Sequence, residues 1–135
     1  MYRTRVYYQD TDAGGVVYYA NYLKLFEKSW FEYLLSCGIS LPEWEEQGTY
    51  VLVKRVELDL LDKSRYGDEL ETRTSVADVK NAQFTLVHVV SRNGKPVTRG
   101  QTFMVCVDGT GKPKRMPEDF KTRLLACQSF SATTI

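Results

Sequence analysis

The chain has 135 residues, of which 43% are hydrophobic and 26% are charged, and its formal net charge is +1. This length fits one domain of residues 1–135, and the near-neutral charge gives no reason to expect a nucleic-acid partner. A membrane span is not expected either, since no run approaches the roughly 20 apolar residues that cross a bilayer. Three cysteines, Cys37, Cys106 and Cys127, are odd in number and form no CxxC pair. We therefore expect reduced thiols in a cytoplasmic protein without a leader sequence.

The N-terminal part of the chain combines an extended and a helical pattern. Tyr2 to Tyr8 alternates arginine with β-forming residues, which predicts a short strand. After a Gly-Gly turn, a helix is predicted from about Tyr19 to Cys37, and Gly38 would end it. Its apolar face collects the expected core residues, which are Tyr22, Leu23, Phe26, Trp30, Tyr33, Leu34 and Cys37. The other face is polar and includes Ser29, and a second short helix is predicted within residues 41–47.

From Tyr50 onward the apolar residues recur at every second position, which is typical of strands. Runs of this kind cover residues 56–60, 70–76, 84–90 and 102–107, with turn-forming residues between them, and predict an antiparallel meander. A short C-terminal helix is expected from Met116, and residues 128–135 are expected to fray. The sequence thus predicts an α+β fold in which a long N-terminal helix is wrapped by an antiparallel β-sheet. Open sheet edges favour a dimer.

The segment before the long helix has the most unusual composition of the chain. Asp10 and Asp12 precede Gly14 and Gly15, which permit a tight turn and the close approach of a ligand. The start of the helix near Tyr19 offers unpaired N–H groups and a partial positive charge. A substrate carbonyl placed there would find an oxyanion site beside a carboxylate. An isolated aspartate before glycine more often only caps a turn.

Two overlapping motifs in this segment resemble those of a known enzyme family. Arg5-Val6 followed by Thr11-Asp12-x-x-Gly15-Val16-Val17 resembles the signature of the 4-hydroxybenzoyl-CoA thioesterase family, and the string DTDAGGVVYYANY is most similar to its YbgC-like branch. The resemblance implies a hotdog fold, active sites at the interface of a homodimer, and often a dimer of dimers. It also implies hydrolysis of a small acyl- or aroyl-CoA to the free acid and CoA, so that coenzyme A is part of the substrate and no cofactor is expected.

The same resemblance assigns roles to particular residues. Asp12, and not Asp10, would be the catalytic aspartate, the backbone N–H of Tyr19 would polarise the thioester carbonyl, and Gly15 and Val16 would contact the substrate. YbgC-like members commonly have histidine where this chain has Tyr19, so no imidazole can assist at that position. Aspartate side chains are ionised near neutral pH, so Asp12 is expected to act as nucleophile or as general base. The sequence leaves both routes open.

Several other polar residues have both a functional and a structural interpretation. Glu27 lies at the edge of the apolar face and would position water, although a partly solvated helix residue is the simpler interpretation. Lys80, Asn81 and Gln83 occupy a turn that often contacts the CoA nucleotide in this family, and a plain exposed hairpin is equally consistent. His88 is expected to be a hydrogen-bonded core residue. No His/Cys cluster has the spacing of metal ligands, so no metal site is expected.

Two functions from other classes remain as alternatives. One is a hotdog protein that binds acyl-CoA without turning it over. The other is a nucleic-acid-binding protein that would use Arg3 and Arg5 with the neighbouring tyrosines, which the net charge disfavours.

Overall fold

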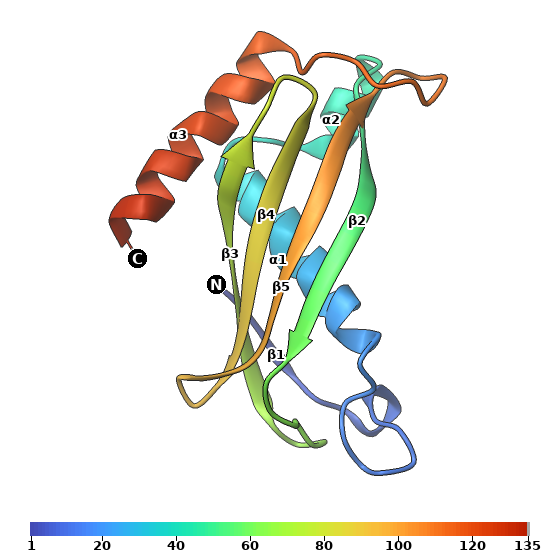
Figure 1. Cartoon of the computed structure of the whole chain (residues 1–135), viewed down its shortest axis with the longest axis vertical. Coiled ribbons are helices and arrows are strands. Elements are labelled where there is room, and N and C mark those ends of the chain that lie inside the picture. Colours follow the sequence, from blue (N-terminus) through green and yellow to red (C-terminus); the bar gives the residue numbers. More distant parts are fainter. Residues whose placement is uncertain (135) are drawn as a thin grey trace.

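The computed structural model describes the backbone of residues 1–134 and the side chains of residues 1–128. The elements follow the chain as β1 (Tyr2–Arg5), a short 3-10 helix η1 (Tyr8–Asp10), α1 (Asn21–Ser36), α2 (Leu41–Glu46), β2 (Tyr50–Leu60), β3 (Glu69–Val79), β4 (Gln83–Arg92), β5 (Lys95–Val107) and α3 (Glu118–Thr134). The strands form one antiparallel sheet in the order β1-β3-β4-β5-β2. This sheet curls around α1, and α3 lies beside β3 (Figure 1).

The predicted strands after Tyr50 are confirmed, the first predicted strand (Tyr2 to Tyr8) ends at Arg5, and the prediction of a simple meander is wrong. β3, β4 and β5 do follow one another through hairpins, whereas β2 pairs with β5 at the far edge of the sheet. Residues 61–68 therefore have to pass from one side of the β3-β4-β5 hairpins to the other. Three strand spacings are about 14 Å, and eight extended residues reach about 27 Å, so the connection is long enough. It becomes a loop beneath the end of the sheet.

Helix α1 is the helix that the sequence predicts between Tyr19 and Cys37, although β1 and η1 precede it, so it is not N-terminal in the strict sense. Tyr22, Phe26 and Leu34 are buried as expected. Two predictions about its faces are wrong: Leu23 is 39% exposed, and Ser29, assigned to the polar face, is buried. Ser29 is buried because its hydroxyl lies 2.7 Å from Thr74 Oγ1 on the sheet.

The contact between α1 and the sheet is closest at Gly100 on β5. A Cβ atom at this position would lie 2.4 Å from the Phe26 ring and 2.8 Å from the carbonyl oxygen of Glu57. Only glycine leaves room for the aromatic ring there, so Gly100 allows α1 to approach the sheet closely.

His88 lies in the same region, directly under Phe26. Its ring stacks on the Phe26 ring with centroids 4.5 Å apart, and its two nitrogens lie 2.9 Å from Thr74 Oγ1 and 2.8 Å from Thr102 Oγ1. Burial lowers the pKa of His88 to about 3. The imidazole is thus a neutral, hydrogen-bonded core residue, as the sequence predicts.

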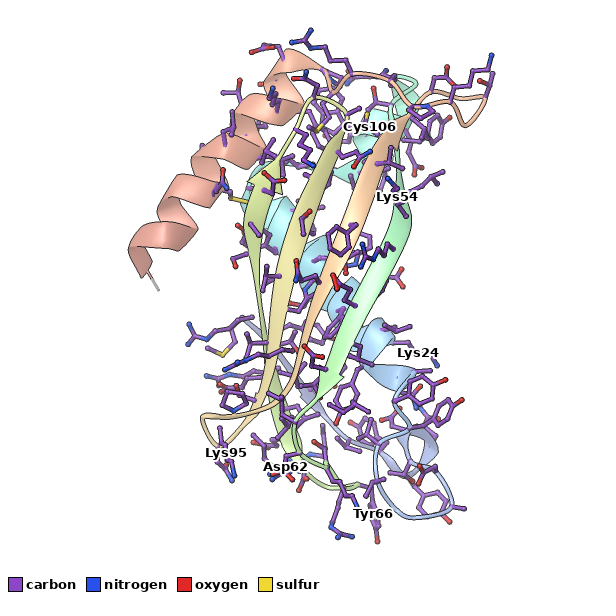
Figure 2. The ribbon with its side chains drawn as sticks, in the orientation of Figure 1. Lys24, Lys54, Asp62, Tyr66, Lys95 and Cys106 are labelled. Atoms are coloured by element: carbon purple, nitrogen blue, oxygen red, sulfur yellow. A yellow bond between two sulfur atoms is a disulfide. The ribbon has the colours of Figure 1, made fainter. Side chains whose placement is uncertain are left out.

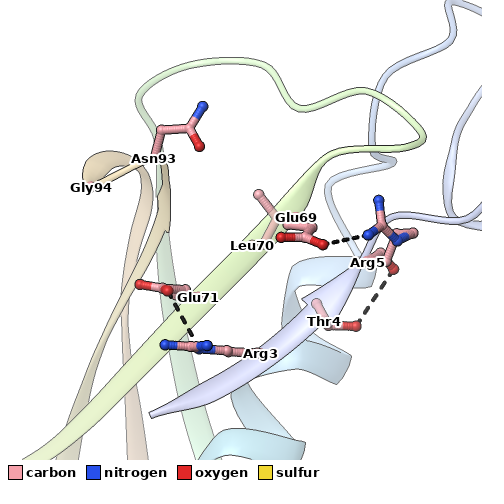
Figure 3. A pocket seen from close by; sticks show the side chains of 8 residues that line it. All are labelled: Arg3, Thr4, Arg5, Glu69, Leu70, Glu71, Asn93 and Gly94. Carbon is pink, nitrogen blue, oxygen red and sulfur yellow. Dashed lines mark hydrogen bonds and ion pairs between the residues drawn. The ribbon is translucent and has the colours of Figure 1, made fainter.

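The short edge strand β1 is held to β3 by ion pairs. Arg3 pairs with Glu71 at 3.5 Å, and Arg5 pairs with Glu69 (Figure 3). The arginines that the nucleic-acid alternative would use therefore each face a carboxylate. A shallow pocket of about 400 Å³ lies over these pairs.

The C-terminal helix α3 is longer than the short helix expected from Met116, and it is covalently attached. A disulfide joins Cys37, at the end of α1, to Cys127 on α3, and Arg123 donates a 2.9 Å hydrogen bond to the carbonyl of Gly38. The prediction of three reduced thiols is therefore wrong, and only Cys106 is a free thiol in the part of the chain that is described. The fraying of residues 128–135 stays a prediction, because the side chains after residue 128 and the whole of residue 135 lie outside the described part of the chain. No described helix has the length and apolarity needed to span a bilayer.

Candidate active site

The loop between β1 and α1 is fixed by Asp10, the first of the two neighbouring acids. The Asp10 carboxylate accepts a 2.8 Å hydrogen bond from the backbone N–H of Tyr7. Its backbone carbonyl accepts two more, from the N–H of Tyr18 at 3.0 Å and from the side-chain amide of Asn21 at 2.9 Å. Asp10 thus joins η1 to the start of α1, and this structural work distinguishes it from Asp12.

Asp12 begins a tight turn that exposes its side chain. Its backbone N–H donates to the carbonyl of Val16 at 2.9 Å, and its carbonyl accepts from Gly15 at 3.0 Å. Gly15 has a φ of 77°, which side-chain-bearing residues rarely adopt. One carboxylate oxygen, Oδ1, accepts a 2.9 Å bond from the N–H of Gly14, and Oδ2 has no partner among the described residues. The turn therefore orients the carboxylate and leaves one oxygen available.

The first turn of α1 supplies the other expected catalytic group. The helix is assigned from Asn21, two residues after the predicted start at Tyr19, but its hydrogen bonds begin earlier. The N–H of Asn21 donates to the carbonyl of Tyr18 at 2.8 Å, and the N–H of Tyr22 donates to that of Tyr19 at 3.1 Å. Within the described chain, the N–H of Tyr19 itself donates to no acceptor. It lies at the positive end of the helix, where an anionic oxygen is stabilised.

Asp12 and Tyr19 line one pocket of about 490 Å³, a size within the range of small-molecule sites. The helix side of the pocket contributes Val16, Val17 and Tyr22 as well, and the opposite wall comes from the loop after β2. The residues of that wall are Leu60, Leu61, Asp62, Lys63 and Ser64. The pocket thus combines an apolar lining with a carboxylate and a free amide.

Backbone bonds join the two walls of the pocket. The N–H of Val17 donates to the carbonyl of Ser64 at 2.7 Å, and Val16 forms a β-bridge with Arg65. The Tyr8 ring also meets the Tyr66 ring edge-on, with centroids 5.8 Å apart. Asp62 and Tyr66 lie at the end of the molecule opposite Cys106 (Figure 2).

Arg92, at the end of β4, clamps the loop of residues 61–68 from the sheet side. Its guanidinium lies 3.1 Å from Asp62 and 3.6 Å from Asp68, and it donates to the carbonyl of Lys63. The pKa of Asp62 is lowered mainly by a hydrogen bond from the backbone N–H of Lys63, and the Arg92 charge lowers it further. Both the Lys63 N–H and the Arg92 charge thus favour the ionised form of the Asp62 carboxyl.

The other residues predicted to take part do not reach this pocket. Glu27 is exposed on α1 and is not among the pocket's lining residues. Lys80, Asn81 and Gln83 lie in and after the β3–β4 turn, at the end of the sheet away from the Asp12 loop (Figure 1). The side chain of Asn81 accepts a 3.0 Å hydrogen bond from Lys121, which ties this turn to α3.

The sequence alone did not identify the pocket wall of residues 60–64, nor the role of Arg92. Residues 61–64 lie in the loop between β2 and β3, where the apolar residues follow neither a helical nor a strand period. The only signal was the polar triplet Asp62-Lys63-Ser64 directly after two leucines. Arg92 is the last residue of β4, and nothing in the sequence distinguishes it from other arginines at strand ends.

Comparisons with known proteins identify the family and the fold of the chain. The family model described as the thioesterase-like superfamily matches residues 6–124. The acyl-CoA thioesterase YbgC of Haemophilus influenzae is 37% identical over 119 residues, which cover 87% of this chain and 88% of the relative. A solved structure of a hypothetical protein from Thermus thermophilus has a TM-score of 0.88 at 27% identity and covers 93% of this chain and 97% of that one.

A DHNA-CoA thioesterase from Staphylococcus aureus has a TM-score of 0.90 at 22% identity, covering 99% of this chain and 93% of its own, and so shares the fold. The expected hotdog fold is confirmed. The match of the family model includes the Asp12 loop, α1 and the strands β2 to β5. The chain therefore belongs to the thioesterase-like superfamily.

Proposed function

We propose that this chain is an acyl-CoA thioester hydrolase, which converts a small acyl- or aroyl-CoA to the free acid and CoA in the Asp12 pocket. One observation carries the proposal: Asp12, whose carboxylate has an oxygen without a partner among the described residues, and Tyr19, whose backbone N–H has no acceptor among them, line the same pocket. The relatives support it, since the Haemophilus influenzae protein is named an acyl-CoA thioesterase. Coenzyme A enters as part of the substrate, and the reaction requires no cofactor.

Two routes use the same groups. In the first, Asp12 Oδ2 attacks the thioester carbon, and the resulting oxyanion accepts a hydrogen bond from the Tyr19 N–H. The C–S bond then breaks, CoA leaves as a thiolate that takes up a proton, and water hydrolyses the mixed anhydride. In the second route, Asp12 removes a proton from water as the water attacks the same carbon. Both routes need the ionised form of the aspartate, and we keep both.

We further propose that the working unit is a homodimer, with a dimer of dimers as the larger assembly. β2 is an edge strand, so one side of its backbone has no neighbouring strand among the described residues. Exposed apolar residues lie on this strand and directly after it, namely Leu52, Val53, Val56, Leu60 and Leu61. An apolar open edge of this length is typical of a strand that pairs with another chain. Lys80, Asn81 and Gln83 would contact the CoA nucleotide only from a neighbouring subunit, because they lie far along the sheet from this chain's own pocket.

We place the protein in the cytoplasm, where CoA esters are made and used. Disulfides such as Cys37–Cys127 are uncommon in the cytoplasm. The location of the protein is therefore best determined directly, with a tagged full-length chain.

The decisive experiment measures thiol release from a panel of short aliphatic, long aliphatic and aromatic CoA esters. Asp12→Asn is expected to lower kcat by about 10²–10⁴-fold, because it removes the nucleophile or base. Asp78→Asn is the matched control, since Asp78 is exposed on β3 and lines no part of the Asp12 pocket. Unchanged turnover in Asp12→Asn would remove Asp12 from its role. Tight binding without thiol release across the panel would favour the alternative, an acyl-CoA-binding protein without activity.

A further inference from the structure

Ser64 carries a buried hydroxyl that the fold does not use. The residue is 1% exposed, and its Oγ atom has no hydrogen-bond partner among the described residues. A buried hydroxyl without a partner destabilises a folded protein, because it loses its hydrogen bonds to water and gains none. Thr72 and Thr98 share this condition in the described chain. Of these three residues, only Ser64 lines the Asp12 pocket.

The backbone of Ser64 is fixed beside the loop that carries Asp12. Its carbonyl accepts the 2.7 Å hydrogen bond from Val17, and the preceding carbonyl, of Lys63, is held by Arg92. The position of the side chain is therefore set by contacts that do not involve the hydroxyl. The neighbouring lining residues Leu60 and Leu61 are apolar and have no side-chain donors for a ligand, while Lys63, Tyr19 and Tyr22 carry donors elsewhere in the pocket.

We propose that the Ser64 hydroxyl donates a hydrogen bond to a carbonyl oxygen of the bound thioester ligand. This inference rests on the proposed function, in which the pocket receives an acyl-CoA. The Oγ atom of Ser64 is itself buried in this structure. It would reach a ligand in the pocket by rotation about the Cα–Cβ bond, without movement of the backbone. An acyl-pantetheine arm presents carbonyl oxygens at the thioester and at its amides. Ser64 is thus a substrate-binding residue on the wall opposite Asp12.

The test compares Ser64→Ala with Thr72→Val, which removes an equally unpartnered hydroxyl outside the pocket. The probe is a dethia acyl-CoA analogue, in which a methylene replaces the thioester sulfur, so that the carbonyl remains and no hydrolysis occurs. Binding is measured by calorimetry and folding by thermal unfolding. Ser64→Ala should raise the Kd about threefold to tenfold, as expected for one neutral hydrogen bond, with a melting temperature that is unchanged or higher. Thr72→Val should leave the Kd unchanged with the same effect on melting.

Two outcomes overturn the Ser64 proposal alone. One is a Kd of Ser64→Ala equal to that of the wild type, and the other is a clear loss of thermal stability, which would show that the hydroxyl has a structural partner. Steady-state kinetics give a second readout, since a binding role predicts a raised KM with kcat nearly unchanged. A wild-type protein that neither binds the analogue nor releases thiol would overturn both the proposed function and this inference, whereas Asp12→Asn tests the function separately.

Discussion

The backbone N–H of Val17 donates a 2.7 Å hydrogen bond to the carbonyl of Ser64, and this bond joins two loops that are distant in sequence. One loop carries Asp12 and the other forms the facing wall of the pocket. A change in the second loop therefore shifts the first. We therefore expect the geometry around the Asp12 carboxylate to depend also on Arg92, which holds the second loop and does not line the pocket.

Arg92 is the residue through which this dependence can be tested. Arg92→Met removes the clamp on Asp62, Asp68 and the Lys63 carbonyl, so the 61–68 loop should loosen and kcat/KM should fall about tenfold, because misplacement in an active site is costly. Arg92→Lys keeps one charge and should recover part of the loss. Thiol release measures the effect. The control is Arg73→Met on β3, and equal kinetics in wild type and Arg92→Met would contradict the clamp.

His88 predicts a pH dependence of stability with a definite sign. Its folded pKa is about 3 and its unfolded pKa is about 6.5, so between these values the unfolded chain binds one more proton. Stability from this group is complete above about pH 6.5 and falls by about 1.4 kcal/mol per pH unit as the pH drops toward 3. Urea unfolding of the wild type and His88→Gln from pH 4 to pH 7 should show this slope only in the wild type. An NMR titration of folded His88 with a midpoint near 6.5 would contradict it.

The disulfide should contribute substantially to stability. It links Cys37 and Cys127 across 90 residues, and closing so long a loop restricts the unfolded chain. Reduction, or the substitution Cys37→Ser, is expected to lower the free energy of unfolding by about 2–5 kcal/mol. Urea unfolding with and without reductant measures this. Cys37→Ser serves as the control because it should not respond to reductant, and a wild type that does not respond either would show that the bond is absent in solution.

Gly100→Ala should destabilise the protein through a steric clash. The new methyl group would meet the buried Phe26 ring and the Glu57 carbonyl, and overpacking of this kind costs about 1–3 kcal/mol. Thermal unfolding of Gly100→Ala, of Phe26→Leu and of the double variant tests the contact. If the smaller side chain at position 26 makes room, the double variant should lose less stability than the sum of the two single variants. Additive losses would place the clash elsewhere.

The local elements of the fold were predictable because they leave local patterns. The two-residue period marked β2 to β5, and the apolar spacing marked α1. The position of β2 beside β5 was not predictable, since alternation along a strand says which face is buried but not which strand lies next to it. Ser29 was assigned to the wrong face of α1 because its partner, Thr74, lies across the core.

The sequence placed Asp12 and Tyr19 together, and both line one pocket of the structure, while their catalytic roles remain predictions. Asp12 and Tyr19 stand close together in the sequence, so one motif placed both at the pocket. Ser64 and Arg92 lie near that motif only in the folded chain, and no spacing in the sequence predicts that they do. The same holds for the Cys37–Cys127 bond, whose partners lie at opposite ends of the chain.

The crossing of residues 61–68 beneath the sheet has an evolutionary consequence. Because this segment is a connection and not part of a strand, insertions and deletions there leave the sheet register intact. A change in the length of this loop would alter the part of the cavity lined by residues 61–64 without altering the sheet. Such changes in length preserve the Asp12 turn only where the Val17–Ser64 bond and the Arg92 clamp are kept, since these contacts fix the position of the loop.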